Sequence, residues 1–260
     1  MPLTADLHTH TMASGHAYST ATELAVAARR AGLGLIAITD HGPTCPGAPD
    51  PWYFWNLKVL PSVLDGVRIL KGVEANPADT ESGVDLPDEI LGQLDFVAVG
   101  FHPLTGFDQR DRARNTDSLL RAIANPLVDM VTHPGNEHEF PLKIDAVVAA
   151  ASAAGVILEL NDHSFAPTSI RAVSNHRERE FAEAAIAAGV PVAVNSDAHF
   201  ASQVGHMEAA LAVASEIGLA EHDIINHTPE KVLTHLLARR ARPRLDYAGA
   251  WESGAFGGGR

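Results

Sequence analysis

The feature that most limits how this chain can fold is a regular alternation of short apolar runs with longer helical stretches. Seven β-type runs recur along the chain, at residues 3–8, 33–39, 67–74, 94–100, 128–132, 156–161 and 190–196. Because these runs are apolar at nearly every position, we expect strands that are buried on both faces, as in a parallel sheet. The alternation therefore predicts consecutive βαβ units and an α/β fold.

Two of the intervening segments carry clear helix boundaries. Thr20 and Glu23 form a predicted capping box at the start of ATELAVAARRAG, and Gly155 ends the segment KIDAVVAAASAAG. No repeat beyond the alternation and no linker is evident, so residues 1–240 are predicted to form one domain. The glycine-rich residues 241–260 are predicted to be a poorly ordered tail.

Parallel βαβ units can build either an open doubly wound sheet or a closed barrel. No glycine-rich dinucleotide-binding motif follows the first run, and polar residues follow the ends of six different runs. Only a closed arrangement brings all of those ends around one point, so the sequence favours a barrel with a site at the carboxyl rim of its strands.

Histidine dominates the polar residues at the ends of the runs. A single histidine beside a strand is usually solvated or hydrogen-bonded, but the same coincidence at five strand ends is not expected. The residues in question are His8, His10, His16, Asp40, His41, Glu74, His102, His133, Asn161, Asp197 and His199.

The spacing of these residues points to metal binding. Residues two apart on a strand point to the same side, so Asp6, His8 and His10 can share one face, as can Asp197 and His199. Neutral imidazoles with a few carboxylates suit zinc, iron or manganese better than magnesium or calcium. The imidazoles are therefore predicted to be metal ligands.

In this order along the chain, the motifs resemble those of the PHP superfamily, named for polymerase and histidinol phosphatase. They are HTH at 8–10, TDH at 39–41, GVEAN at 72–76, GFHP at 100–103, THPGN at 132–136 and SDAH at 196–199. The resemblance is closest to the YcdX-type stand-alone bacterial phosphatases and covers residues from about 5 to about 240. It implies a distorted, TIM-like (β/α)7 barrel with a trinuclear metal centre at its carboxyl rim.

The resemblance also implies a role for each ligand. His8, His10 and Asp197 would hold one metal, Glu74 would bridge it to a second, and His102 and His133 would complete the second. His16, His41 and His199 would hold the third. The three divalent ions would be zinc, with manganese or iron as alternatives. Glu74, Asp197 and His199 are the residues expected to act most directly in catalysis.

The activity implied by this centre is metal-dependent hydrolysis of small phosphomonoesters by a hydroxide that bridges two metals. Two alternatives stay open at this point. One is histidinol phosphatase proper, for which no imidazole-binding pocket can be identified in the sequence. The other is a nuclease or phosphodiesterase of the same superfamily, or a metal-binding module without catalysis.

Composition bears on partners and location. A total of 19 Lys and Arg against 32 Asp and Glu gives a formal net charge of -13, which makes duplex nucleic acid an unexpected partner. The chain has one cysteine, Cys45, and no signal-peptide pattern or long apolar run, so a soluble cytoplasmic protein is predicted. A small phosphorylated molecule is the expected partner, and homo-oligomerisation stays open.

Several neighbouring residues allow more than one interpretation. Asp6 and Asp40 either orient imidazoles or make ordinary structural hydrogen bonds. The aromatic residues 52–55 either wall the site, form a subunit contact or pack over the rim. For Asn136, Asn161, Ser164 and Arg171, polarity of surface loops is favoured over substrate contact. The remaining histidines are interpreted as structural or solvated: His138, His163, His176, His206, His222, His227 and His235.

Overall fold

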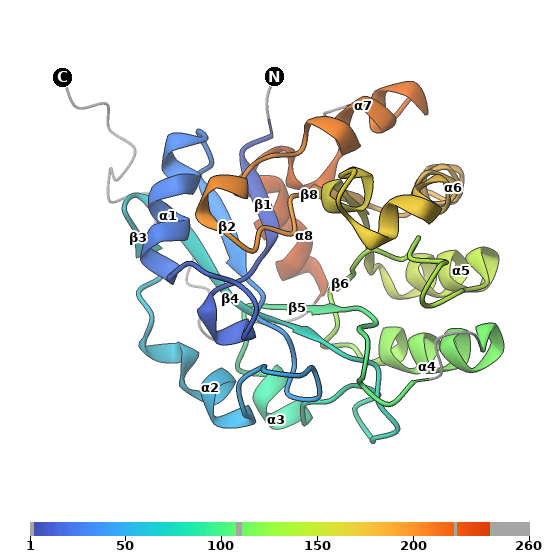
Figure 1. Cartoon of the computed structure of the whole chain (residues 1–260), viewed down its shortest axis with the longest axis horizontal. Helices are drawn as coiled ribbons and strands as arrows, with labels where there is room; N and C mark the ends of the chain where they lie inside the picture. The colour runs from blue at the N-terminus through green and yellow to red at the C-terminus, as the bar shows by residue number, and fades with distance from the viewer. Residues whose placement is uncertain (1–2, 108–110, 221–222, 240–260) are drawn as a thin grey trace.

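The computed structural model describes residues 3–107, 111–220 and 223–239 (Figure 1). Its strands are β1 (Ala5–Thr9), β2 (Leu35–Ile38), β3 (Val63–Leu64), β4 (Val67–Ala75), β5 (Phe96–Val99), β6 (Met130–Val131), β7 (Ile157–Asn161) and β8 (Val192–Asn195). Its α-helices are α1 (Ala21–Arg30), α2 (Pro51–Asn56), α3 (Asp88–Leu91), α4 (Arg112–Ala124), α5 (Ile144–Ala154), α6 (Asn175–Ala187), α7 (Glu208–Glu216) and α8 (Pro229–Arg239). The tail predicted at 241–260 lies outside the described residues.

The sheet runs in the order β1-β2-β4-β5-β6-β7-β8, and every neighbouring pair in this path is parallel. All seven predicted strands are therefore confirmed, and the sheet curls into the predicted α/β barrel. The two-residue β3 was not predicted; it pairs antiparallel with the start of β4.

Side-chain amides help to close the barrel between β1 and β8. At the carboxyl end, the His10 N–H donates to the Ala198 carbonyl at 2.8 Å. Deeper in the seam, the Leu7 N–H donates to Asn195 Oδ1 at 2.8 Å, and Asn226 Nδ2 donates to the Ala5 carbonyl at 2.8 Å. Amide side chains thus satisfy backbone groups that a regular strand ladder would pair, which leaves a distorted, nearly closed barrel.

The two ends of the barrel interior differ in chemistry. Towards the amino-terminal ends of the strands the interior is apolar, with Leu35 and Phe96 packing in one cluster with Leu233 and Leu236 of α8. Towards the carboxyl ends it is polar, because the inward positions there are taken by Glu74 and Glu159, both buried. The apolar half contributes to the stability of the barrel, and the polar half provides the side chains of a potential active site.

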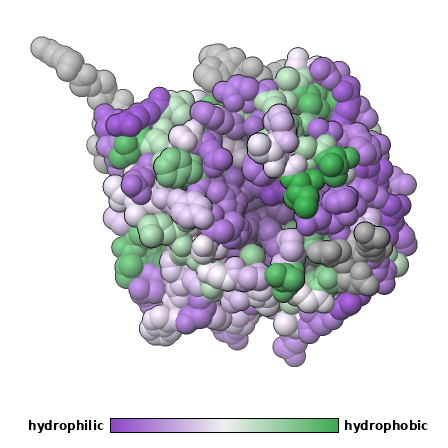
Figure 2. All heavy atoms as spheres, in the orientation of Figure 1, coloured by the Kyte–Doolittle hydropathy of each residue, from purple (hydrophilic) through white to green (hydrophobic). Residues whose placement is uncertain are grey.

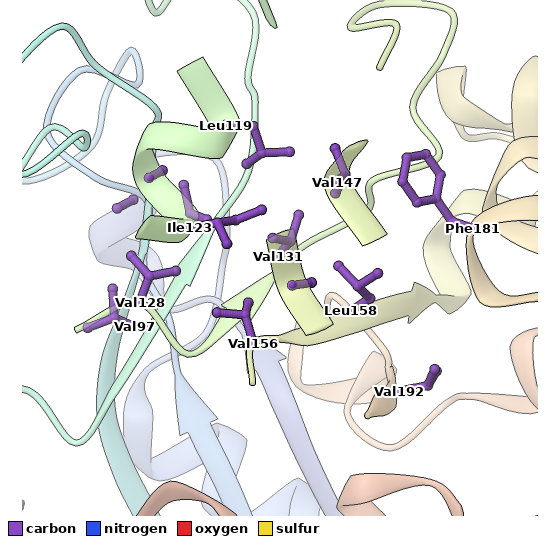
Figure 3. Packing of buried hydrophobic residues seen from close by; sticks show 14 of the residues in the cluster. Val97, Leu119, Ile123, Val128, Val131, Val147, Val156, Leu158, Phe181 and Val192 are labelled. Atoms are coloured by element: carbon purple, nitrogen blue, oxygen red, sulfur yellow. The ribbon is translucent and has the colours of Figure 1, made fainter. Parts of the chain in front are cut away.

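A second apolar layer joins the outer face of the sheet to its helices. Val131 and Leu158 of the sheet pack in a cluster with Ile123 of α4, Val147 of α5 and Phe181 of α6 (Figure 3). This layer packs the helices against the sheet, and the rim loops connect the strands to these helices. None of the helices in the described part of the chain is long and apolar enough to cross a membrane.

The predicted helix boundaries are also confirmed. Thr20 accepts a hydrogen bond from the Glu23 N–H, and the Glu23 carboxylate accepts from the Thr20 N–H, so α1 begins with a capping box. Gly155 follows α5 with φ 63°, in the left-handed region that favours glycine.

Candidate metal centre

All nine predicted ligands meet at the carboxyl rim of the barrel. His8 lies in β1 and Glu74 in β4, and the others lie in the loops that follow β1, β2, β5, β6 and β8. Four sets of three potential ligand atoms lie within 4.8 Å of one another: His8–His10–Asp197, His8–Glu74–His133, His41–Glu74–His102 and His10–His41–His199. The ninth residue, His16, has its Nε2 3.2 Å from the Nε2 atoms of His41 and His199.

Glu74 is at the middle of this arrangement, and its two oxygens face different partners. Oε2 lies 3.3 Å from His8 Nε2, 3.5 Å from His10 Nε2, 3.2 Å from His102 Nε2 and 2.9 Å from His41 Nδ1. Oε1 accepts from Thr132 Oγ1 at 2.6 Å and lies 2.8 Å from His133 Nε2. One carboxylate therefore touches most of the histidine set.

Five buried atoms at this point have no hydrogen-bond partner among the described residues: His8 Nε2, His10 Nε2, His41 Nδ1, His102 Nε2 and Glu74 Oε2. An unsatisfied buried polar atom costs about 1–3 kcal/mol, so five of them in one place require an explanation. Four imidazole nitrogens and a carboxylate oxygen form the donor set that zinc and related divalent ions prefer. The residues present therefore fit a metal centre.

The protonation states suit metal binding as well. Burial lowers the pKa of His16 to about 4, and burial with His199 and His41 nearby holds the pKa of His10 well below its usual value. Burial raises the pKa of the Glu74 carboxyl, but nearby His102 and His8 lower it by more. Burial likewise raises the pKa of Asp197, and nearby His8 and Arg171 lower it by more. Both pKa values are therefore well below normal. Neutral imidazoles and ionised carboxylates are the forms that bind metal.

His8 is the exception among the imidazoles of the centre. Burial opposes its protonation, but Glu159, Glu74 and Asp197 outweigh burial and raise its pKa. This shift is what three unneutralised carboxylates produce beside one imidazole. A divalent ion at the centre would compete with that proton.

Hydrogen bonds fix the second ring nitrogen of several histidines. His8 Nδ1 lies 2.8 Å from Glu159 Oε1, His10 Nδ1 lies 3.1 Å from Ser14 Oγ, and His102 Nδ1 lies 2.8 Å from Asn76 Oδ1. A partner at Nδ1 selects the tautomer that leaves Nε2 free as a ligand, and it fixes the direction in which the ring points.

Asp40 supports the histidine centre indirectly, through a residue that contacts His10. Its carboxylate accepts from the Ser14 hydroxyl at 2.7 Å, which in turn contacts His10, and from the Tyr53 hydroxyl at 2.6 Å. Tyr53 and Trp55 of the aromatic segment pack against the main core, whereas Trp52 is exposed. Tyr53 of the aromatic segment thus supports Asp40.

Asp6 does not face the centre, although it lies two residues before His8. It accepts from the Ser196 hydroxyl at 2.6 Å and from the N–H groups of His8 and Gly205. The pairing of β1 with β2 is irregular between Asp6 and Thr9, which breaks the expected two-residue alternation. Asp6 therefore has the structural role that sequence analysis left open.

Glu159 and Asn76 are among the supporting residues that were not predicted. Glu159 accepts from His8, from the His133 N–H at 2.8 Å and from both Asn161 and Asn195. Asn76 holds His102, as described above. The available signal for Glu159 was a lone charge within the apolar run VILELN at 156–161.

Arg171 reaches the centre, contrary to its favoured interpretation as a polar loop residue. Its Nη2 donates to Asp197 Oδ2 at 2.8 Å, and Asn161 Nδ2 donates to the same oxygen at 3.3 Å. Asp197 Oδ1 is left to face His8 Nε2 at 3.4 Å and His10 Nε2 at 3.3 Å. Arg171 therefore holds one oxygen of Asp197 and leaves the other directed at His8 and His10.

The backbone is unusual at two of these residues. His133 has φ 30° and Asp197 has φ 55°, in or near the left-handed region that non-glycine residues rarely adopt. Such conformations cost about 1–3 kcal/mol and persist where the surrounding structure holds them, often at functional sites.

By its fold and site, the protein is a parallel α/β barrel with a histidine-rich centre at its carboxyl rim. The family model of the PHP domain matches residues 6–163, and the chain belongs to this family. A probable phosphatase of Thermoanaerobacter sp. (strain X514) is 44% identical over 242 residues, which are 93% of this chain and 98% of the relative. A probable phosphatase of Shewanella sp. (strain ANA-3) is 40% identical over 234 residues, 90% of this chain and 91% of the relative.

Among solved structures, a histidinol phosphate phosphatase of Lactococcus lactis, complexed with zinc, L-histidinol and phosphate, has the same fold. Its TM-score is 0.63 at 15% identity, with 85% of this chain and 95% of that chain covered. At this identity the similarity supports the barrel architecture alone.

Proposed function

We propose that this chain is a metal-dependent phosphatase that hydrolyses small phosphomonoesters with three divalent ions. The observation that carries the proposal is the convergence of four imidazole nitrogens on Glu74 Oε2, all five atoms being buried without a hydrogen-bond partner among the described residues. The names of the curated relatives, which are called probable phosphatases, agree with it. Zinc is the proposed metal, with manganese or iron as alternatives, because the donor set is rich in imidazole.

The proposed ligands are divided among the three ions as follows. His8, His10 and Asp197 would hold the first ion, His102 and His133 the second, and His16, His41 and His199 the third. Glu74 could serve more than one ion, since its Oε1 and Oε2 face different histidines. When bound, such ions lower the pKa of a water molecule towards about 7 and place positive charge against the phosphoryl oxygens.

The chain's own residues prepare the site for this reaction. Arg171 and Asn161 hold one oxygen of Asp197, so that the other stays directed at His8 and His10. Glu159 orients His8 and the backbone of His133. In the reaction, the oxygen of water bonds to phosphorus as the P–O ester bond breaks. The leaving alkoxide takes up a proton, and the products are an alcohol and inorganic phosphate.

The proposed partner is a small phosphorylated substrate. The cytoplasmic location, the possible homo-oligomer and the single domain at 1–240 stay predictions from the sequence.

Phosphate release tests the proposed function. The purified chain is loaded separately with zinc and with manganese and assayed with an aryl phosphate, a sugar phosphate, a mononucleotide and histidinol phosphate. His10→Ala should abolish release, whereas His206→Ala, which changes an exposed histidine outside the centre, should not. Absence of release from every ester by the loaded protein would contradict the proposal.

A further inference from the structure

The depth of the centre determines where the rest of a substrate must lie. His8, His10 and Glu74 are fully buried, whereas His16 is exposed and the His199 side chain is 25% exposed. A phosphoryl group held at the centre therefore leaves its ester group at the rim. Figure 2 shows a hydrophilic hollow near the middle of one face, with hydrophobic residues along its border.

The loops that carry the centre expose large apolar side chains. Five of the ten exposed large hydrophobic residues in the described chain lie within two positions of His16, His102, Arg171 or His199. We call these five the rim collar: Tyr18, Leu104, Ile170, Val173 and Phe200. Exposed apolar side chains are ordinary when scattered, but a concentration around one site marks a binding surface.

The parts of these loops that lie beside the collar residues carry little charge. Residues 11–19, 102–107, 164–174 and 198–204 contain no Asp, Glu or Lys and one arginine, Arg171, whose guanidinium is paired with Asp197. In the loop after β6, Glu137 is paired with Arg112 and Arg177. These four described segments therefore offer no carboxylate for an ammonium group and no lysine for a second phosphate.

Leu104 differs from the rest of the collar because both its exposure to solvent and its backbone conformation are unfavourable for a leucine. Its side chain is 83% exposed, and its φ of 66° lies in the left-handed region, where glycine or asparagine is preferred. Neither feature benefits the folded chain by itself. Both are expected where a side chain is kept for contact with a ligand.

We propose that the substrate is a phosphomonoester of an uncharged, apolar alcohol or phenol, whose ester group packs on the rim collar. The inference rests on the proposed phosphatase function and narrows it. It disfavours histidinol phosphate, because the amino group of that compound would find no carboxylate in the four segments that carry the collar. It also disfavours nucleotides with a second phosphate.

Esters of similar leaving-group basicity separate binding from intrinsic reactivity. The zinc-loaded protein is assayed with ethyl, n-hexyl and 6-aminohexyl phosphate, and kcat/KM is compared. Hexyl phosphate should exceed ethyl phosphate by about tenfold or more, because four further methylene groups leave water. It should exceed 6-aminohexyl phosphate by a similar factor, since burying the ammonium group without a partner is unfavourable.

A variant of the collar tests the residues. Leu104→Asn suits the left-handed backbone and removes the apolar side chain, so it should lower the hexyl-to-ethyl ratio about threefold or more without loss of stability. Leu237→Asn, which changes an exposed leucine of α8 away from the centre, should leave the ratio unchanged. Calorimetry with hexyl- and ethylphosphonate measures the corresponding ratio of binding affinities without turnover.

The outcomes distinguish the two proposals. Hydrolysis of all three esters at similar kcat/KM, or preference for the amino ester, would overturn the apolar substrate and leave the phosphatase standing. Absence of any hydrolysis would overturn the phosphatase, and the collar would then be judged by whether hexylphosphonate binds more tightly than ethylphosphonate. Equal binding of the two phosphonates would overturn the collar.

Discussion

Replacing Glu159 with Gln should weaken the metal centre although Glu159 is not itself a proposed ligand. The carboxylate is buried and accepts four hydrogen bonds, from His8 Nδ1 at 2.8 Å, Asn195 Nδ2 at 2.9 Å, the His133 N–H at 2.8 Å and Asn161 Nδ2 at 3.0 Å. Burial raises the pKa of Glu159, but His8 outweighs it and the net pKa is lowered, so the fold stabilises the charged form.

Gln keeps the size of Glu but has one acceptor oxygen instead of two. Two of the four donors would then face the amide NH₂ group, at about 1–3 kcal/mol for each buried donor left without an acceptor. We therefore expect the unfolding free energy of the metal-free protein to fall by about 2–6 kcal/mol. Because partners that orient metal ligands typically contribute 10–100-fold to affinity, zinc binding should weaken by about that factor.

Competition with a chromogenic zinc chelator measures the affinity, and urea denaturation measures the stability. Glu89→Gln, an exposed Glu in the first turn of α3, is the matched control and should change neither. Unchanged zinc affinity in a folded Glu159→Gln protein would refute the role of Glu159 in orienting His8.

Three further predictions follow from particular contacts. Burial, reinforced by Glu159, raises the pKa of Glu178 to about 8. Between pH of about 4.5 and 8 the native state thus holds a proton that the unfolded chain has lost, and stability falls as pH rises, by up to about 1.4 kcal/mol per pH unit. Glu178→Gln should remove that slope in urea denaturation of metal-free protein; an unaltered slope would contradict it. Gly100→Ala would place a Cβ 2.1 Å from Thr132 Oγ1 and 3.1 Å from Glu74 Oε1, so the displaced Glu74 should reduce bound zinc and stability should fall by about 1–3 kcal/mol, measured by metal analysis and denaturation. Thr20→Ala removes the cap of α1 and should cost about 1 kcal/mol in denaturation with zinc content retained; loss of zinc would show that α1 supports the centre more directly than we infer.

Local sequence patterns predicted the strands and the histidine set because both are expressed within a few residues. The strand runs are apolar at almost every position, and βα alternation places each carboxyl end at one rim, so His102 and His133 could be assigned without coordinates. β3 was missed because two residues, Val63 and Leu64, are too few to form a pattern.

The missed supports of the centre are long-range contacts. Glu159 meets His8 across 151 positions of the chain, and Arg171 meets Asp197 across 26. Nothing near Arg171 in the sequence distinguishes it from a solvated loop arginine. Asp6 shows the converse, since strand periodicity grouped it with His8 and an irregular pairing in β1 turned it towards Ser196. Partners of this kind depend on register and closure, which a single sequence does not display.

Native mass spectrometry of the zinc-titrated protein counts the ions bound to each chain, and so tests whether the histidine cluster binds three metal ions. We expect three zinc ions on the wild-type protein and fewer on a folded Glu74→Gln variant, since Glu74 contacts most of the histidine set. A wild-type protein that binds no zinc, or a Glu74→Gln variant that binds the same number as the wild type, would contradict this expectation.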